Sequence, residues 1–264
     1  MKIAIMTDLE GVAGVVDSPN WCRPEGRYYD IAKELLTEEV NAAVRGFRSG
    51  GVEQMQVIDG HGCGAIDIRL LDSGVEYARG WPDGWPFGID SSFDAVAWVG
   101  QHAKAGTERA HLAHTQSFAY VDLSVNGVSI GEFGQIAFCA AELGVPAIFG
   151  SGDQAFADEA ATLMPGIETV VVKRGVTSGK GDECTLDQYQ LRNAGAVHFA
   201  PQRARDLIFE GAARAIERFR RNPFKVRTLD PPYESVTILR ADAEHERREV
   251  RKSHDSSFIG LMNS

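Results

Sequence analysis

The stretch KIAIMTDLEG, residues 2–11, opens the regular structure of the chain and indicates its fold. Residues 2–7 are short, apolar and contain two isoleucines, which predicts a buried strand. Asp8 and Glu10 follow where this strand would end, and Gly11 comes directly after them. On these residues alone, the two acids fit a metal site, a phosphoryl-accepting aspartate or an ordinary solvated turn.

Further strands and helices alternate along the chain. Short apolar runs predict strands at 54–60, 94–100, 146–150, 168–173 and 235–240. Apolar residues at helical spacing predict helices at about 29–49, 134–143, 153–163 and 201–221. The Asn126-Gly127 pair predicts a hairpin within 119–130, and the charged segment 241–257 predicts an exposed helix and tail.

This order of elements is typical of an α/β fold. We expect a three-layer αβα arrangement around a mixed, largely parallel central sheet, because the hairpin adds antiparallel pairing. We also expect a metal-binding α/β domain over residues 1–173 and a smaller C-terminal region over 174–264, either separate or part of the same domain. That region holds a polar insertion at 174–200, an amphipathic helix and a late strand.

Composition narrows the class of function. The 264 residues carry a net charge of −10, which disfavours nucleic acids and anionic membranes as partners. We find no apolar stretch near the ~20 residues that span a bilayer and no apolar core of a secretory signal, so we expect a cytoplasmic protein. The four scattered cysteines form no CxxC pair and are expected to be reduced, with Cys63 a buried structural thiol.

Polar side chains follow successive predicted strands. Asp8 and Glu10 follow the first strand, His61 the second, His102 the third, and Glu132 the hairpin. Since ligands bind at the carboxyl ends of strands in open α/β sheets, these five side chains are expected to converge. Nitrogen and oxygen donors of this kind suit zinc, manganese or cobalt better than calcium. Five ligands exceed the three of a mononuclear catalytic zinc site and fit two metals, with the short Asp8 as the natural bridge.

Each residue also has a simpler interpretation. An acid after a strand is more often a turn or helix cap than a ligand, and Glu132 could be an ordinary first-turn acid. His111 and His114 are spaced to share a helical face, and one of them could act as a general acid or base. For His111 we favour a solvated histidine instead.

A phosphatase interpretation competes for the same acids. DLEGV at 8–12 resembles the DxDGT nucleophile loop of haloacid-dehalogenase-like magnesium phosphatases, in which Asp8 would accept a phosphoryl group. Asp153 and Asp158 would then be downstream magnesium ligands, although Asp153 also fits a helix cap. Against this interpretation, the second acid is Glu10 rather than aspartate, and the histidines have no role in it.

Five motifs in order resemble the M55 metallopeptidases, a family of D-aminopeptidases: TDLEG at 7–11, DGHG at 59–62, GQHAKAG at 100–106, HTQS at 114–117 and GEFG at 131–134. The resemblance implies two Zn²⁺ ions per subunit, with Mn²⁺ or Co²⁺ as alternatives and no organic cofactor. It implies that Asp8 bridges the ions, that Glu10 and His61 complete one site, and that His102 and Glu132 complete the other.

The resemblance also assigns His114 as the catalytic residue. In that family, the matching histidine is assigned as a nucleophile. On physical grounds we expect a proton-transfer or oxyanion-stabilising group, because a metal-held hydroxide can itself attack the carbonyl. Ile136 stands where the family pattern has asparagine, a change expected near the substrate pocket.

The expected function is therefore a dinuclear zinc aminopeptidase. It would remove N-terminal residues, D-amino acids among them, from short peptides or aminoacyl amides by means of a metal-bridging hydroxide. The alternatives are a metal-dependent amidohydrolase acting on a non-peptide amide, the magnesium phosphatase, and a non-enzymatic metal- or peptide-binding subunit. The resemblance further implies a large ring-shaped homo-oligomer that encloses the active sites.

Overall fold

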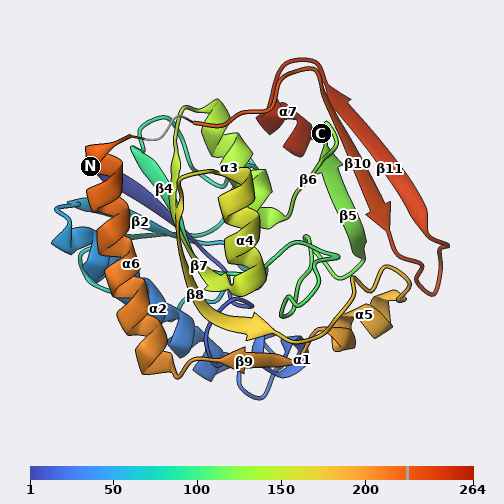
Figure 1. Cartoon of the computed structure of the whole chain (residues 1–264), viewed down its shortest axis with the longest axis horizontal. Helices are drawn as coiled ribbons and strands as arrows, with labels where there is room; N and C mark the ends of the chain where they lie inside the picture. The colour runs from blue at the N-terminus through green and yellow to red at the C-terminus, as the bar shows by residue number, and fades with distance from the viewer. Residues whose placement is uncertain (224–225) are drawn as a thin grey trace.

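The computed structural model describes residues 1–223 and 226–264 and contains two β-sheets (Figure 1). The larger sheet has the strand order β3-β2-β1-β4-β7-β8-β9, and every pair in it is parallel except β8 with β9. Its strands are β1 (Lys2–Thr7), β2 (Gln54–Asp59), β3 (Glu76–Ala78), β4 (Ala95–Gln101), β7 (Ala147–Asp153), β8 (Glu168–Gly175) and β9 (Ala196–His198).

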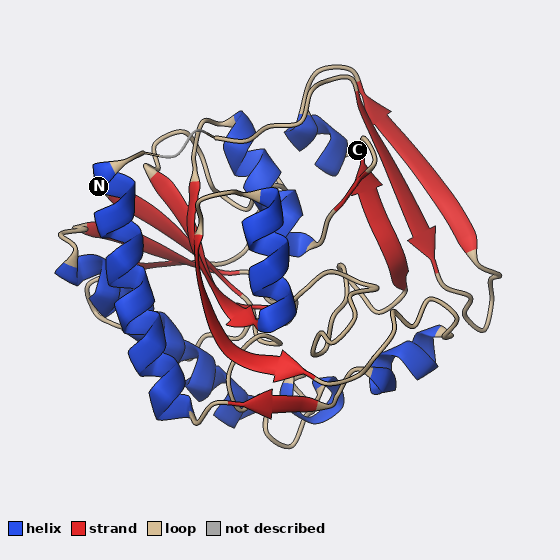
Figure 2. Cartoon of the chain, in the orientation of Figure 1, coloured by secondary structure: helices blue, strands red, loops and turns tan. Residues whose placement is uncertain are grey.

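Helices cover both faces of this sheet, as Figure 2 shows. On one face lie α2 (Tyr29–Ser49) and α6 (Pro201–Arg221), and on the other lie α3 (Glu132–Glu142) and α4 (Gln154–Leu163). Side chains along β1 alternate between the two faces of the sheet, so that Ile3 and Ile5 pack into one core and Ala4 and Met6 into the other. The three-layer α/β prediction is confirmed.

The smaller sheet is antiparallel, with the order β11-β10-β5-β6. Asn126 and Gly127 take positive φ angles of 50° and 77° between β5 and β6, which confirms the predicted hairpin turn. The strands of this sheet are β5 (Tyr120–Val125), β6 (Val128–Ser129), β10 (Tyr233–Leu239) and β11 (Arg248–His254).

The exposed helix predicted within 241–257 is wrong. The charged sequence REVRKSH instead forms β11, which pairs with β10 along its whole length and lies at the sheet edge. Its residues are nearly all exposed, so the strand has no apolar alternation by which a sequence pattern could reveal it. The short helix α7 (Phe258–Met262) follows and buries Phe258 and Leu261.

Other short elements lie in regions where the sequence predicts no helix or strand: α1 (Ser18–Trp21), β3, α5 (Leu186–Arg192) and β9. Both α5 and β9 belong to the polar segment 174–200, and β9 pairs with β8. The proposed boundary after residue 173 stays a prediction. Within the described ranges, no helix combines the length and the apolar character that a membrane crossing requires.

The strand register places the ends of β1, β2 and β4 side by side. Thr7, the last residue of β1, is level with Asp59 of β2 and Val99 of β4. The loop after β1 packs directly on the end of β4, because the Gly11 N–H donates to the Gly100 carbonyl at 2.7 Å. A Cβ atom at Gly11 would lie 2.1 Å from the Gln101 carbonyl oxygen, so only glycine allows this approach.

Candidate metal centre

The first group of candidate ligands is formed by Asp8, Glu10 and His61. Asp8 and Glu10 follow β1, and His61 follows β2, so neighbouring parallel strands deliver all three to one edge. One donor atom from each lies within 4.8 Å of the others, and all three residues are buried. His61 Nε2 lies 3.5 Å from Glu10 Oε1. We call this the Asp8 group.

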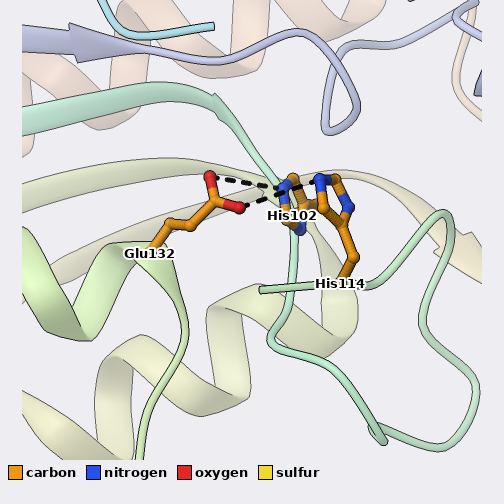
Figure 3. A group of neighbouring side chains, drawn as sticks. All are labelled: His102, His114 and Glu132. Atoms are coloured by element: carbon orange, nitrogen blue, oxygen red, sulfur yellow. Dashed lines mark ion pairs between the residues drawn. The ribbon is translucent and has the colours of Figure 1, made fainter. Parts of the chain in front are cut away.

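The second group is formed by His102, His114 and Glu132 (Figure 3), and its donor atoms also lie within 4.8 Å of one another. His102 Nε2 is 3.8 Å from Glu132 Oε2, and His114 Nε2 is 3.7 Å from Glu132 Oε1. The two imidazole rings stack with their centroids 4.1 Å apart. We call this the His102 group.

The two groups meet at Asp8. Its Oδ2 atom lies 3.2 Å from His102 Nε2, which brings all six side chains into one centre. The same oxygen accepts a hydrogen bond of 3.0 Å from Gln101 Nε2, and Oδ1 accepts one of 2.8 Å from the Leu9 N–H. Asp8 therefore lies between the two groups.

Backbone carbonyls orient two of the histidines. His102 Nδ1 lies 2.9 Å from the Ala103 carbonyl oxygen, and His114 Nδ1 lies 2.9 Å from that of Leu112. Since a carbonyl only accepts, these contacts assign the proton to Nδ1 and leave Nε2 facing the centre. His61 differs, because its Nδ1 faces the sulfur of Cys63 at 3.6 Å.

Burial and crowding perturb the acids and histidines strongly. Burial raises the pKa of Asp8 to about 7, and the Glu10 charge adds to the rise. Burial also acts to raise the pKa of Glu10, but the nearby histidines, His61 first, outweigh it and lower that pKa. For His102, burial opposes the charged form, yet Glu132 and Asp8 raise its pKa. Such packing of acids and imidazoles is typical of a functional centre.

The residues fit a pair of bound metal ions. Glu10 Oε2 and His102 Nε2 are buried and have no hydrogen-bond partner within the described part of the chain. Leaving such atoms without a partner is costly, and a cation between the groups would satisfy both. Imidazole nitrogens with carboxylate oxygens form a donor set that zinc accepts.

A cavity of about 430 Å³ opens over this centre at the carboxyl ends of the strands. Asp8, Glu10, His61, His114 and Glu132 line its floor, and further lining residues come from the loops around it. Of these, sequence reasoning missed Arg23 and the aromatic residues Trp85, Phe87 and Phe118. They carry no motif, since the cavity is assembled from loops far apart in the sequence.

Gln101 was also missed as a partner of Asp8, although it stands directly beside His102 in the sequence. The sequence signal that could have revealed Gln101 was its place beside His102 at the end of a buried apolar strand, where a polar residue is unusual. The side chain of Gln101 now explains how one oxygen of Asp8 is held in place.

The structure also shows the surroundings of His111, Cys63 and Asp153. His111 is fully buried rather than solvated, and its Nε2 lies 3.0 Å from the Val16 carbonyl oxygen, outside the centre. Cys63 is an exposed thiol rather than a buried one. Asp153 is the N-cap of α4, and its two oxygens accept from the backbone N–H groups of Phe156 and His111 at 2.9 Å. This capping role accounts for Asp153 without a magnesium ion, as the alternative interpretation of this residue expected.

Comparisons with known proteins agree with the geometry of the centre. A peptidase family model, M55, described as D-aminopeptidase, matches residues 1–249. A protein named D-aminopeptidase from Bacillus subtilis (strain 168) is 27% identical over 244 residues, which cover 90% of this chain and 81% of that protein.

A solved structure is also similar to the whole chain. It is described as the Zn-dependent D-aminopeptidase DppA from Bacillus subtilis, a self-compartmentalizing protease. The TM-score is 0.85 at 20% sequence identity, and the match covers 100% of this chain and 94% of the other. At this level of identity, the comparison establishes a shared fold.

Proposed function

Because the chain belongs to the M55 family of D-aminopeptidases, we propose that it is a zinc-dependent aminopeptidase with two metal ions in the centre described above. The substrates would be short peptides or aminoacyl amides, D-amino acids among their N-terminal residues. The observation that carries the proposal is the arrangement of six donor side chains as two groups of three, joined where Asp8 lies 3.2 Å from His102.

In this proposal, five of the six side chains would hold the two metal ions. Glu10 and His61 would hold one zinc ion, His102 and Glu132 the other, and Asp8 would contact both. When bound, zinc supplies a Lewis acid that polarises the scissile carbonyl and lowers the pKa of water, which provides a nucleophile at neutral pH.

His114 would transfer a proton during the reaction. Its Nδ1–H is engaged by the Leu112 carbonyl, so the neutral ring presents Nε2 as an acceptor at the cavity floor. This nitrogen can take a proton as the nucleophile forms and return it to the leaving amine. Because His114 also lies within ligand distance of its neighbours in the His102 group, metal content of a His114 variant is the measurement that separates a catalytic role from a ligand role.

The cavity has an electrostatic polarity that would orient a substrate. Three carboxylates lie on its floor, whereas Arg23 is the one Lys or Arg among its lining residues. Arg23 is exposed, and no ion pair joins it to another residue that the structure describes. The α-amino group of a short peptide would face the carboxylates, and the peptide's C-terminal carboxylate would face Arg23. Ile136 and Phe118 add apolar surface to the cavity lining.

The similar B. subtilis structure is described as self-compartmentalizing. We therefore also propose that this chain forms a homo-oligomer, with a ring as the expected form. Enclosure by other subunits would restrict access to the cavity and admit only short peptides. Light scattering of the purified protein tests this part: a monomer at working concentration would contradict it.

Metal analysis and a substrate panel test the main proposal. Protein purified without chelators should carry about two zinc ions per chain, as a two-metal site requires, and should hydrolyse D- or L-aminoacyl amides and short peptides. Asp8→Ala should lose both zinc ions, His61→Ala should lose the ion of the Asp8 group, and both variants should lose activity. Asp67→Ala is the matched control, because Asp67 is an equally buried acid that pairs with Arg69 away from the centre. Absence of bound zinc from the wild-type protein, or absence of hydrolysis across the panel, would refute the proposal.

A further inference from the structure

Two charged residues outside the metal centre each form hydrogen bonds to the backbone at or beside the candidate ligands of one group. We propose that Lys173 positions Glu10 of the Asp8 group and that Glu159 positions His102 and Glu132 of the His102 group, each independently of the other. The inference rests on the proposed two-metal function, and it adds two positioning residues that no motif of the sequence contains.

Lys173 lies near the end of β8 and is only 2% exposed. Its Nζ atom donates to three backbone carbonyl oxygens, those of Glu10 at 2.5 Å, Val12 at 2.9 Å and Val15 at 3.3 Å. An ammonium group has three donors, so this loop uses all of them. The first acceptor belongs to Glu10 itself, which means that Lys173 holds the backbone of a candidate ligand.

The contact between Lys173 and the Glu10–Val15 loop does not result from strand pairing. In the sheet, β4 and β7 lie between β1 and β8, so Lys173 is not a neighbour of the loop through strand pairing. Its side chain therefore links β8 to residues 10–15, in addition to the hydrogen bonds that this loop makes to Gly100, Glu39 and His198. A buried cation is costly unless its donors are satisfied, and here the Glu10–Val15 loop satisfies them.

Glu159 lies on α4 and makes the equivalent contact for the other group. Its Oε2 accepts from the Lys104 N–H at 2.8 Å and its Oε1 from the Gly131 N–H at 3.2 Å. Lys104 follows His102 by two residues, and Gly131 directly precedes Glu132. One carboxylate thus joins the two chain segments that carry His102 and Glu132.

These two segments are packed tightly where Glu159 joins them. A Cβ atom at Gly131 would meet the Lys104 Cβ at 2.7 Å, and Glu159 Oε1 at 3.2 Å. Because the segments touch without intervening side chains, a change in the Glu159 contacts shifts His102 and Glu132 relative to each other. Among the hydrogen bonds of the described residues, none joins the Glu159 side chain to the Glu10–Val15 loop or the Lys173 side chain to the His102 and Glu132 segments.

Separate supports predict separate effects on metal binding. Loss of an outer contact to a metal ligand typically weakens metal affinity by 10–100-fold. Lys173→Met should weaken one of the two zinc-binding steps by about tenfold or more and leave the other within about twofold. Glu159→Leu should do the same to the other step. Calorimetric titration of zinc into chelator-treated protein measures both steps.

Variants in which one group of ligands is disabled identify which zinc-binding step each residue affects. In His61→Ala, which disables the Asp8 group, Lys173→Met should cause no further loss of zinc affinity, while Glu159→Leu still should. In His102→Ala the pattern should reverse. Such cycles isolate coupling between residues from their separate effects.

A control distinguishes positioning from general stability. Arg240 is likewise a buried cation that donates to backbone carbonyls, including that of Cys184 at 3.3 Å, but it contacts neither group. Arg240→Met should lower the melting temperature of the metal-free protein without changing either zinc-binding step. If Lys173→Met or Glu159→Leu does not fold, Lys173→Gln, which keeps a hydrogen-bond donor, and the isosteric Glu159→Gln take their places.

Two outcomes would overturn the inference: equal weakening of both zinc-binding steps by either variant, or folded variants with unchanged zinc affinity. Both differ from failure of the proposed function, which would be seen in the wild-type protein as the absence of two zinc-binding steps.

Discussion

Replacing Gly11 with alanine places a methyl group where the structure has no space for it. The new Cβ atom would lie 2.1 Å from the Gln101 carbonyl oxygen and 2.4 Å from that of Gly100. Both are backbone atoms of β4 and cannot rotate away. Restoring an ordinary contact of 3.4 Å to Gln101 requires the loop after β1 to move by about 1.3 Å.

A displacement of this size has two consequences. It breaks the 2.7 Å hydrogen bond from the Gly11 N–H to Gly100, and it moves the adjacent Glu10 away from His61. Overpacking costs about 1–3 kcal/mol and the lost hydrogen bond about 1 kcal/mol, so we expect a loss of about 2–4 kcal/mol in the free energy of unfolding. Metal–ligand distances tolerate about 0.2 Å, so the Asp8 group should lose its zinc ion.

Denaturant unfolding and zinc titration of Gly11→Ala measure these two effects. Gly62→Ala is the matched control, since Gly62 lies beside His61 and a Cβ atom there would meet nothing within 4 Å. The control should bind zinc and unfold like the wild type. Wild-type zinc stoichiometry and stability in Gly11→Ala would refute the claim that the close approach of β1 and β4 shapes the centre.

Three further predictions concern substrate binding, catalysis and pH. Arg23→Gln should lower kcat/KM for a dipeptide about tenfold but leave kcat/KM unchanged for the same dipeptide with an amidated C-terminus. Arg27→Gln, which lies outside the cavity lining, should change neither value. Equal losses on both substrates would contradict the proposal that Arg23 faces the C-terminal carboxylate of the peptide. His114→Ala should retain both zinc ions and lose kcat by 10²–10⁴-fold, and loss of zinc would make it a ligand instead. Burial lowers the pKa of His111 to about 2 and that of His198 to about 4, so unfolding takes up protons below about pH 6.5 and the free energy of unfolding falls as the pH drops. In chelator, His111→Gln should reduce this slope by up to about 1.4 kcal/mol per pH unit between pH 6 and 4, and an unchanged slope would exclude His111 as its source.

The sequence was informative where residues repeat a simple period or end a strand. The apolar runs predicted β1, β2, β4, β7 and β8 to within a few residues, because buried parallel strands are continuously apolar. The polar residues after those strands could be grouped since parallel strands align their carboxyl ends.

Other features could not be predicted for physical reasons. The edge strand β11 is defined by its hydrogen bonds to β10 and not by burial, so its charged side chains carry no periodic signal. His111 is buried by packing against His198 from a distant segment. Lys173 contacts Glu10 across two intervening strands, and no spacing in a sequence encodes such a contact. Side chains that act on the centre from another part of the fold therefore require the structure.

The central position of β1 has a consequence for biosynthesis. This strand is made before β2 and β4, yet it lies between them in the sheet. Asp8 and Glu10 therefore remain hydrated on the nascent chain until His61 and His102 have been synthesised and their strands have docked. Pairing β1 with β4 spans a long loop, which slows folding. The nascent chain must thus bring Asp8 and Glu10 together with His61, which is made about 50 residues later, before the Asp8 group is complete.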